Sequence, residues 1–257
     1  MRELSLRPVS IALCAALIAA CGSAAQRADG AENKVDAATY NVQLGIEYMR
    51  KGNLALAKEK LERALKQNPR DPNVHSSVAL LYERLGERKK SDSHFRTALR
   101  LAPQNPDISN NYAVYLCRTG RHAEGVKRFE DAARNPLYRT PELAWTNAGV
   151  CLRQADRDKD AEACFARALK VRPNFAEAAY QLGDLYLEQG RANDARTNVE
   201  QYLKAFTATP DLLLLAVRTS CSLGDRVAEA RYSRKLRLDF PSSDAARALG
   251  ELSCKPG

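Results

Sequence analysis

Residues 44–69 read LGIEYMRKGNLALAKEKLERALKQNP, and residues 78–103, which lie 34 positions further along the chain, read VALLYERLGERKKSDSHFRTALRLAP. Both stretches place small residues, large apolar residues and a proline at the same offsets. Comparison of the chain with itself at this period extends the match to residues 145–173 and 182–202. A fixed period of about 20–50 residues is typical of repeat architectures, so the body of the chain is predicted to be a repeat array.

The recurring residues suit units made of two helices. A small residue on the first helix lets the second helix approach closely, and a proline after the second helix cannot continue it. Gly52, Gly86, Gly120 and Gly190 fall between the two helices, where glycine adopts a left-handed backbone at low cost. The recurring positions are Leu44, Gly45, Tyr48, Ala57, Leu61, Ala64 and Pro69 in the first unit, and Trp145, Ala148, Gly149, Leu152, Ala161, Phe165, Ala168 and Pro173 in the fourth.

This pattern resembles the tetratricopeptide repeat. The resemblance implies an all-α, right-handed superhelical solenoid of six helix pairs over residues 37–241, in which stacking of the units makes a continuous core. The third unit is about two residues longer, within the segment 135–141, and the sixth, residues 210–241, is degenerate. Ser243 is expected to cap a last helix, so that residues 242–257 form a capping helix and tail.

The N-terminal segment has the pattern of an export signal. Arg2 and Arg7 precede or flank an apolar run, residues 9–20, that is too short to span a bilayer and has the length of a signal-peptide core. Residues 18–22, IAACG, resemble a bacterial lipobox, which implies cleavage before Cys21 and lipidation of Cys21. Residues 1–20 are then a lipoprotein signal peptide and residues 21–36 a lipidated, flexible tether. An ordinary secretory signal and an uncleaved anchor remain alternatives.

Gly22 follows the lipidation site, and it bears on the membrane to which the protein is sent. In lipoproteins of this kind an aspartate at that place is the usual signal for retention in the inner membrane. Its absence therefore favours the outer membrane, with the protein facing the periplasm.

Charge and motif content exclude several classes of function. The formal net charge is +9, and loss of Arg2, Glu3 and Arg7 with the signal peptide lowers it to +8. Basic residues are interspersed with acidic ones, so we expect a solvated surface rather than a nucleic-acid site. No phosphate loop, metalloprotease or hydrolase motif is present, and the acidic residues near Asp158 fit a solvated turn better than a metal site. We expect no enzyme activity, metal, cofactor or small-molecule substrate.

The cysteines of the body suggest an oxidising compartment. Cys117 and Cys151 stand late on the first helices of neighbouring units, 34 residues apart. Cys221 and Cys254 repeat this arrangement on the sixth unit and the capping helix, 33 residues apart. Because neighbouring first helices are adjacent and parallel, the placement predicts two disulfides and leaves Cys164 over. Buried free thiols are the alternative.

A further resemblance is more specific. Residues 110–121, NNYAVYLCRTGR, residues 135–138, NPLY, and residues 144–151, AWTNAGVC, together with the lipobox, resemble the type IV pilus biogenesis lipoproteins of the PilF/PilW pilotin family. This implies an adaptor that binds subunits of the pilus secretin and promotes their localisation and multimerisation in the outer membrane. Alternatives are a lipoprotein of the β-barrel assembly machine, a scaffold for cell-wall enzymes, or an unrecognised enzyme.

The repeat resemblance also implies where a partner binds. In tetratricopeptide arrays the second, fifth, ninth and twelfth places of the first helix line the concave wall. In units one and two an apolar part of this wall would suit a helix or strand of the partner, although its residues could instead pack against one another. The predicted groove consists of Thr39, Val42, Ile46, Met49, Asn73, Ser76, Leu80 and Glu83.

Overall fold

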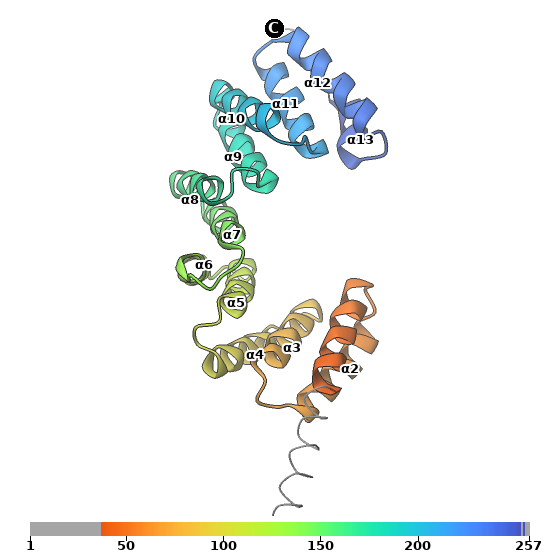
Figure 1. The fold of residues 1–257 in the computed structure, drawn as a ribbon, viewed down its shortest axis with the longest axis vertical. Helices are drawn as coiled ribbons and strands as arrows, with labels where there is room; N and C mark the ends of the chain where they lie inside the picture. The colour runs from red at the N-terminus through yellow and green to blue at the C-terminus, as the bar shows by residue number, and fades with distance from the viewer. Residues whose placement is uncertain (1–36, 253, 255–257) are drawn as a thin grey trace, which may run out of the picture. The chain divides into compact units, whose positions relative to one another are not determined.

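The computed structural model describes residues 37–252 and Cys254, and all regular secondary structure in these residues is helical. The predicted signal peptide, the predicted lipidation site Cys21 and the predicted tether lie outside the described residues. The chain divides into two compact units, Met1–Pro103 and Gln104–Gly257, and each is described by itself. The prediction of an all-α tetratricopeptide fold is confirmed (Figure 1).

The first unit contains two helix pairs and one core. A helix through residues 37–50 pairs with α2 (Leu54–Gln67), and α3 (Pro72–Arg84) pairs with α4 (Arg88–Leu101). The core buries Ala57, Leu61 and Ala64 of α2 against Val78 and Leu81 of α3. Ala57, Leu61 and Ala64 are recurring positions of the repeat pattern, whereas Leu81 is not one of them.

The second unit contains four helix pairs and a final short helix. Two buried clusters run through it, one centred on the pair α7–α8 and one on the pair α11–α12. The final helix α13 packs against α11 and α12, as expected of a capping helix. The pairs are α5 (Pro106–Arg118) with α6 (His122–Arg134), α7 (Pro141–Arg153) with α8 (Asp158–Val171), α9 (Ala176–Glu188) with α10 (Ala192–Ala205), and α11 (Pro210–Ser222) with α12 (Arg226–Asp239), followed by α13 (Asp244–Glu251).

Small residues decide how closely paired helices approach. A Cβ atom on Gly45 would lie 2.5 Å from Cγ of Leu61 on α2. A Cβ on Gly125 of α6 would lie 2.4 Å from Sγ of Cys117 and 3.0 Å from the carbonyl oxygen of Ala113. Such distances are far inside van der Waals contact, so the packing at these crossings requires glycine.

The turn inside a repeat needs a left-handed residue. Gly52, Gly86, Gly120, Gly190 and Gly224 have φ between 69° and 82°. In the pair α7–α8 the same place is taken by Asp156, with φ 56°. Aspartate tolerates this region better than most residues, which explains why the fourth repeat can turn without glycine.

The connection between α6 and α7, residues 135–140, is longer than the connections between the other helix pairs. Hydrogen bonds and one buried side chain hold it in place. The Asn135 side-chain amide donates to the carbonyl oxygen of Gln104, and its oxygen accepts from the backbone N–H of Leu137. Tyr138 is buried in the core next to α7, whereas Leu137 is exposed. The two extra residues of the third unit are thus accommodated by a hydrogen-bonded loop.

The predicted cap of α13 is present. Ser243 Oγ accepts a hydrogen bond of 3.1 Å from the backbone N–H of Ala246. Asn53 and Asp225 cap α2 and α12 in the same way. A side-chain cap of this kind stabilises a helix by about 1 kcal/mol because it satisfies an otherwise unpaired N–H.

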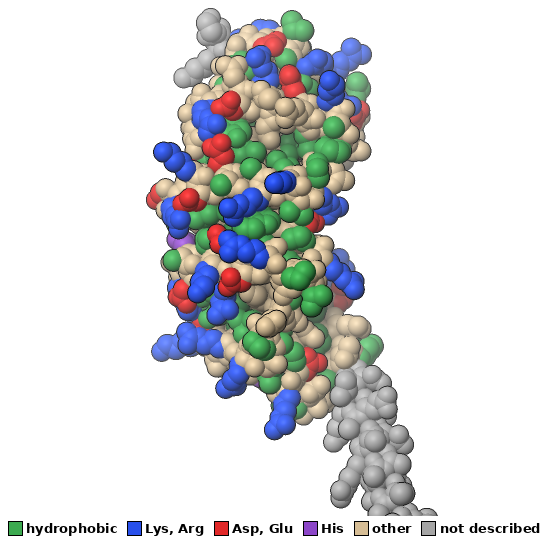
Figure 2. All heavy atoms as spheres, turned by 60° about the vertical axis from the view of Figure 1, so that its left-hand side comes forward, with side chains coloured by type: hydrophobic (Ala, Val, Ile, Leu, Met, Phe, Trp, Pro, Cys, Tyr) green, Lys and Arg blue, Asp and Glu red, His purple; other side chains and the backbone are tan. Residues whose placement is uncertain are grey.

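Basic and acidic side chains are interspersed on the face drawn in Figure 2. Many pair within one helix turn, as Arg96 does with Asp92 and Arg157 with Asp160. Within residues 37–252, no helix has the length and apolar character needed to cross a membrane.

Candidate functional site

The eight residues of the predicted groove come from the helix of residues 37–50 and from α3. Thr39, Ile46 and Asn73 are exposed, Ile46 at 45%. Val42 and Leu80 are half-buried and pack against the core of the first unit. Glu83 is half-buried as well. The apolar part of the groove that solvent can reach therefore consists of the exposed Ile46 and the half-buried Val42 and Leu80.

Two members of the predicted groove do not lie on an open surface. Met49 is 5% exposed and belongs to the core of the first unit, and Ser76 is also 5% exposed. Met49 is covered because the end of its helix lies against α3, where Arg84 donates a 3.0 Å hydrogen bond to the Met49 carbonyl oxygen. Here the prediction is corrected: Met49 and Ser76 are buried and do not form part of the accessible surface of the groove.

A pair of imidazoles on α3 and α4 lies in the same unit and was not predicted from the sequence. His75 Nδ1 and His94 Nδ1 are 3.0 Å apart, and His75 Nε2 is 3.0 Å from the Pro69 carbonyl oxygen. A carbonyl can only accept, so His75 donates through Nε2 and accepts through Nδ1, which makes His94 the donor. Tyr82 stacks on His94. The contact between the two neutral rings thus joins α3 to α4.

Burial lowers the pKa of His94, and the neighbouring His75 lowers it further. A proton added to His94 would enter at Nε2 and leave the Nδ1–H donor in place, but it would put a charge on a half-buried ring next to His75. The neutral pair is consequently the form that fits this packing.

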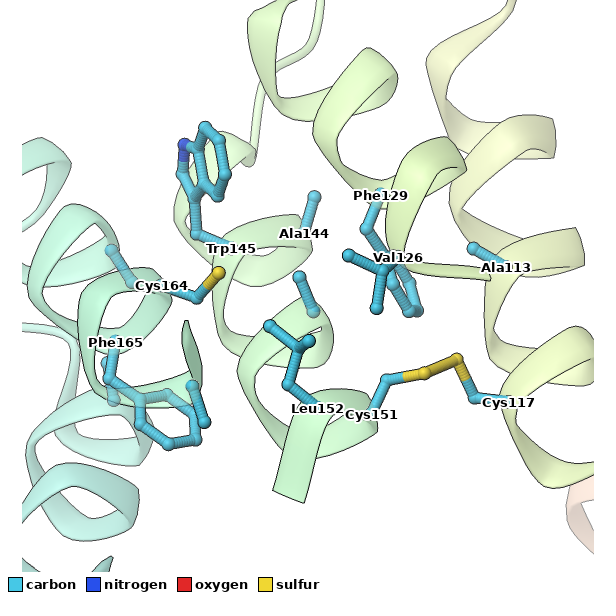
Figure 3. Packing of buried hydrophobic residues seen from close by; sticks show 14 of the residues in the cluster. Ala113, Cys117, Val126, Phe129, Ala144, Trp145, Cys151, Leu152, Cys164 and Phe165 are labelled. Atoms are coloured by element: carbon cyan, nitrogen blue, oxygen red, sulfur yellow. A yellow bond between two sulfur atoms is a disulfide. The ribbon is translucent and has the colours of Figure 1, made fainter. Parts of the chain in front are cut away.

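The first disulfide joins two neighbouring helices of the second unit. Cys117 near the end of α5 and Cys151 near the end of α7 are bonded, with their Cα atoms 5.7 Å apart (Figure 3). Beside the bond is a hollow of about 220 Å³ lined in part by Val114, Asn147 and Val150.

A second disulfide joins Cys221 of α11 to Cys254, which lies beyond the end of α13 at Glu251 and not on the capping helix as predicted. Cys164 on α8 is free and buried beside Trp145 (Figure 3). Burial raises the pKa of the Cys164 thiol to about 11, so the thiol stays protonated and inert near neutral pH. The five cysteines of the body therefore form two structural cross-links and one core residue.

An ion-pair ladder runs across three first helices of the second unit. Asp184 on α9 accepts from Arg153 on α7 at 3.4 Å and from Arg218 on α11 at 2.8 Å. Arg153 also donates to Gln181 on α9. The side chains of Arg153 and Asp184 are mostly covered, at 19% and 13% exposed. The ladder therefore links the first helices of three consecutive repeats, α7, α9 and α11.

The described residues offer little for chemistry. Within them, no group of three or more His, Cys, Asp or Glu side chains lies close enough together to hold a metal ion. Asp156 lies in the α7–α8 turn, Asp158 is the first residue of α8, and Asp160 pairs with Arg157. Trp145 packs in the core beneath the guanidinium group of Arg167.

Sequence profiles described as tetratricopeptide repeats match residues 42–106, 79–141 and 144–218. The type IV pilus assembly protein PilF of Pseudomonas aeruginosa is 25% identical over 202 residues, which cover 79% of this chain and 80% of PilF. The crystal structure of PilW, described as a widely conserved type IV pilus biogenesis factor, is 31% identical with a TM-score of 0.67, over 82% of this chain and 97% of PilW.

This chain belongs to the PilF/PilW family of tetratricopeptide-repeat proteins of type IV pilus biogenesis. A solved P. aeruginosa PilF structure agrees, at 25% identity and a TM-score of 0.66 over 85% of this chain and 99% of PilF. The family resemblance predicted from residues 110–121, 135–138 and 144–151 is confirmed. Membership of the PilF/PilW family implies protein partners in the pilus machinery, and repeat proteins of this kind are scaffolds and adaptors.

Proposed function

We propose that this PilF/PilW-family protein is an outer-membrane lipoprotein adaptor, a pilotin, for the type IV pilus secretin. It binds secretin subunits and promotes their localisation and multimerisation in the outer membrane. The observation that carries the proposal is the match of this chain to nearly the whole length of PilW and PilF, whose descriptions assign them to pilus biogenesis and assembly.

The proposed anchor is Cys21. Residues 18–22 resemble a lipobox, and several acyl chains on one cysteine hold a protein on a membrane where a single chain would be marginal. The anchored protein faces the periplasm. Secretin subunits exported into the periplasm would meet it there.

The proposed contact with the secretin is the exposed part of the groove in the first unit. Ile46 is a large apolar residue at 45% exposure, with the half-buried Val42 and Leu80 also on the predicted wall. An apolar surface on a helical scaffold can accept a helix or a strand of another protein. Covering the 45% of Ile46 that is exposed would stabilise such a contact by about 0.7–1.4 kcal/mol.

Co-purification of the secretin from solubilised envelopes tests this contact. Ile46→Asp should weaken recovery of the secretin while circular dichroism stays unchanged. Val171→Asp is the matched control, because Val171 at the end of α8 is 49% exposed and lies outside the predicted groove. Equal secretin recovery with all three proteins would remove the groove from the proposal. Recovery of barrel-assembly components or cell-wall enzymes instead of secretin would favour those alternatives.

A further inference from the structure

The outer face of α12 carries basic residues together with two highly exposed apolar side chains. Val227 and Leu238 are 82% and 67% exposed near the two ends of the helix. At 3.6 residues per turn they fall on the same line as Arg234, directly opposite the buried Leu236. We call this surface, with its flanking residues, the α12 outer face: Val227, Ala230, Arg231, Arg234, Arg237 and Leu238.

Acidic groups are absent from the middle of this face. Glu229 is turned inward, where it accepts a hydrogen bond from Ser233, and Asp239 pairs with Lys235. Arg231 lies over the ring of Tyr232 and is 4.0 Å from Glu200 of α10. Arg234 and Arg237 form no ion pair within the described part of the chain. The face therefore carries positive charge that the second unit does not neutralise.

The α12 outer face combines exposed apolar side chains with arginines, as helices that lie on a membrane surface do. An open hollow of about 510 Å³ over Ala230 and Leu238 is bordered by Arg231 and Arg234, and by Lys235 with its ion-pair partner Asp239. Val227 and Leu238, on either side of Arg234 along the helix, can bury methyl groups among acyl chains while the guanidinium groups of the face bind phosphates. From this geometry we infer that the α12 outer face binds an anionic phospholipid surface.

The charge pattern favours a lipid surface over an acidic protein. A docking site for an acidic helix would pair cations with a recess bounded by a second element, whereas the lining of this hollow comes from α12 alone. The exposed Val227 and Leu238 also lie about three turns apart, so both can enter a flat interface together. This contact goes beyond the proposed anchor at Cys21 and does not require it.

Vesicle sedimentation of the full chain tests the inference. Wild type should bind phosphatidylglycerol vesicles more tightly than phosphatidylcholine vesicles at low salt, and Arg234→Glu/Arg237→Glu should reduce the phosphatidylglycerol binding roughly tenfold or more. Lys89→Glu/Arg100→Glu on α4 makes the same change in net charge and should bind like wild type. Val227→Ser/Leu238→Ser should weaken binding while leaving its salt dependence in place. All variants carry the same N-terminal segment, so its contribution cancels.

Three results would overturn the inference. Retained vesicle binding by the α12 charge variant is the first, and an equal loss by the α4 control is the second. The third is a loss of secretin co-purification by the α12 variant with vesicle binding intact, which would make the face a protein-docking surface. Failure of the Cys21 or Ile46 experiments would leave these vesicle measurements unaffected, so the two proposals fail separately.

Discussion

A Cβ atom on Gly149 of α7 would lie 2.4 Å from Cε1 of Phe165 on α8, so this crossing depends on the missing side chain. Phe165 is fully buried in the core of the second unit. The ring cannot move aside without opening a cavity among its neighbours.

Gly149→Ala is therefore expected to destabilise the second unit by about 1–3 kcal/mol, because overpacking a filled core forces side chains from their preferred rotamers. Urea unfolding followed by the fluorescence of Trp145, the single tryptophan, measures this. Gly250→Ala is the control, since a Cβ there meets nothing within 4 Å. Equal stability of the two variants would show that α7 and α8 are not in close contact at Gly149.

The disulfide between Cys117 and Cys151 should be present in protein isolated from the periplasm. Non-reducing peptide mapping identifies it, and recovery of both residues as alkylated free thiols would contradict it. Cys117→Ser/Cys151→Ser should lower the free energy of unfolding by about 3–4 kcal/mol, the loop-closure contribution for a loop of this length. Cys164→Ala, which removes a thiol that takes part in no disulfide, tests whether loss of a cysteine alone explains the effect.

The His75–His94 pair predicts a dependence on pH in the first unit. The pKa of His94 lies below its ordinary value of about 6.5, so the unfolded chain binds a proton more readily than the folded one. Stability is therefore fully present above pH 6.5 and falls as the pH drops through the folded-state pKa.

Hydrogen exchange of α3 and α4 at pH 7.5 and 5.5, corrected for the intrinsic rates, measures the effect. His94→Gln should flatten the pH response, and His122→Gln in the second unit should leave it as in wild type. An identical response of all three proteins would mean that the imidazole pair does not couple protonation to folding.

The repeat period predicted most of the fold because each repeat meets its neighbours through the same few positions. Gly45, Gly149 and Ala57 are small where helices cross, and their positions follow directly from spacing along the chain. The late placement of Cys117 and Cys151 on neighbouring first helices led to their pairing for the same reason. Ser243 as a cap needed only the local sequence.

The features that the repeat period did not predict depend on contacts between individual side chains. The twelfth place of a first helix lines an open wall in the general repeat, but Met49 at that place is covered by α3. The contact between His75 and His94 links positions that are not part of the repeat pattern. The ladder from Arg153 through Asp184 to Arg218 likewise depends on charges that vary from one unit to the next.

The central proposal is that an anchored adaptor delivers the secretin to the outer membrane, and Cys21 tests it most directly. The measurement is fractionation of secretin multimers between membranes in cells that carry Cys21→Ser at the native level. Residue 21 lies outside the described repeats, so circular dichroism of the variant should remain that of a folded helical protein. The proposal predicts secretin monomers, or multimers in the wrong membrane, together with reduced piliation. Normal secretin multimers in the outer membrane would contradict it.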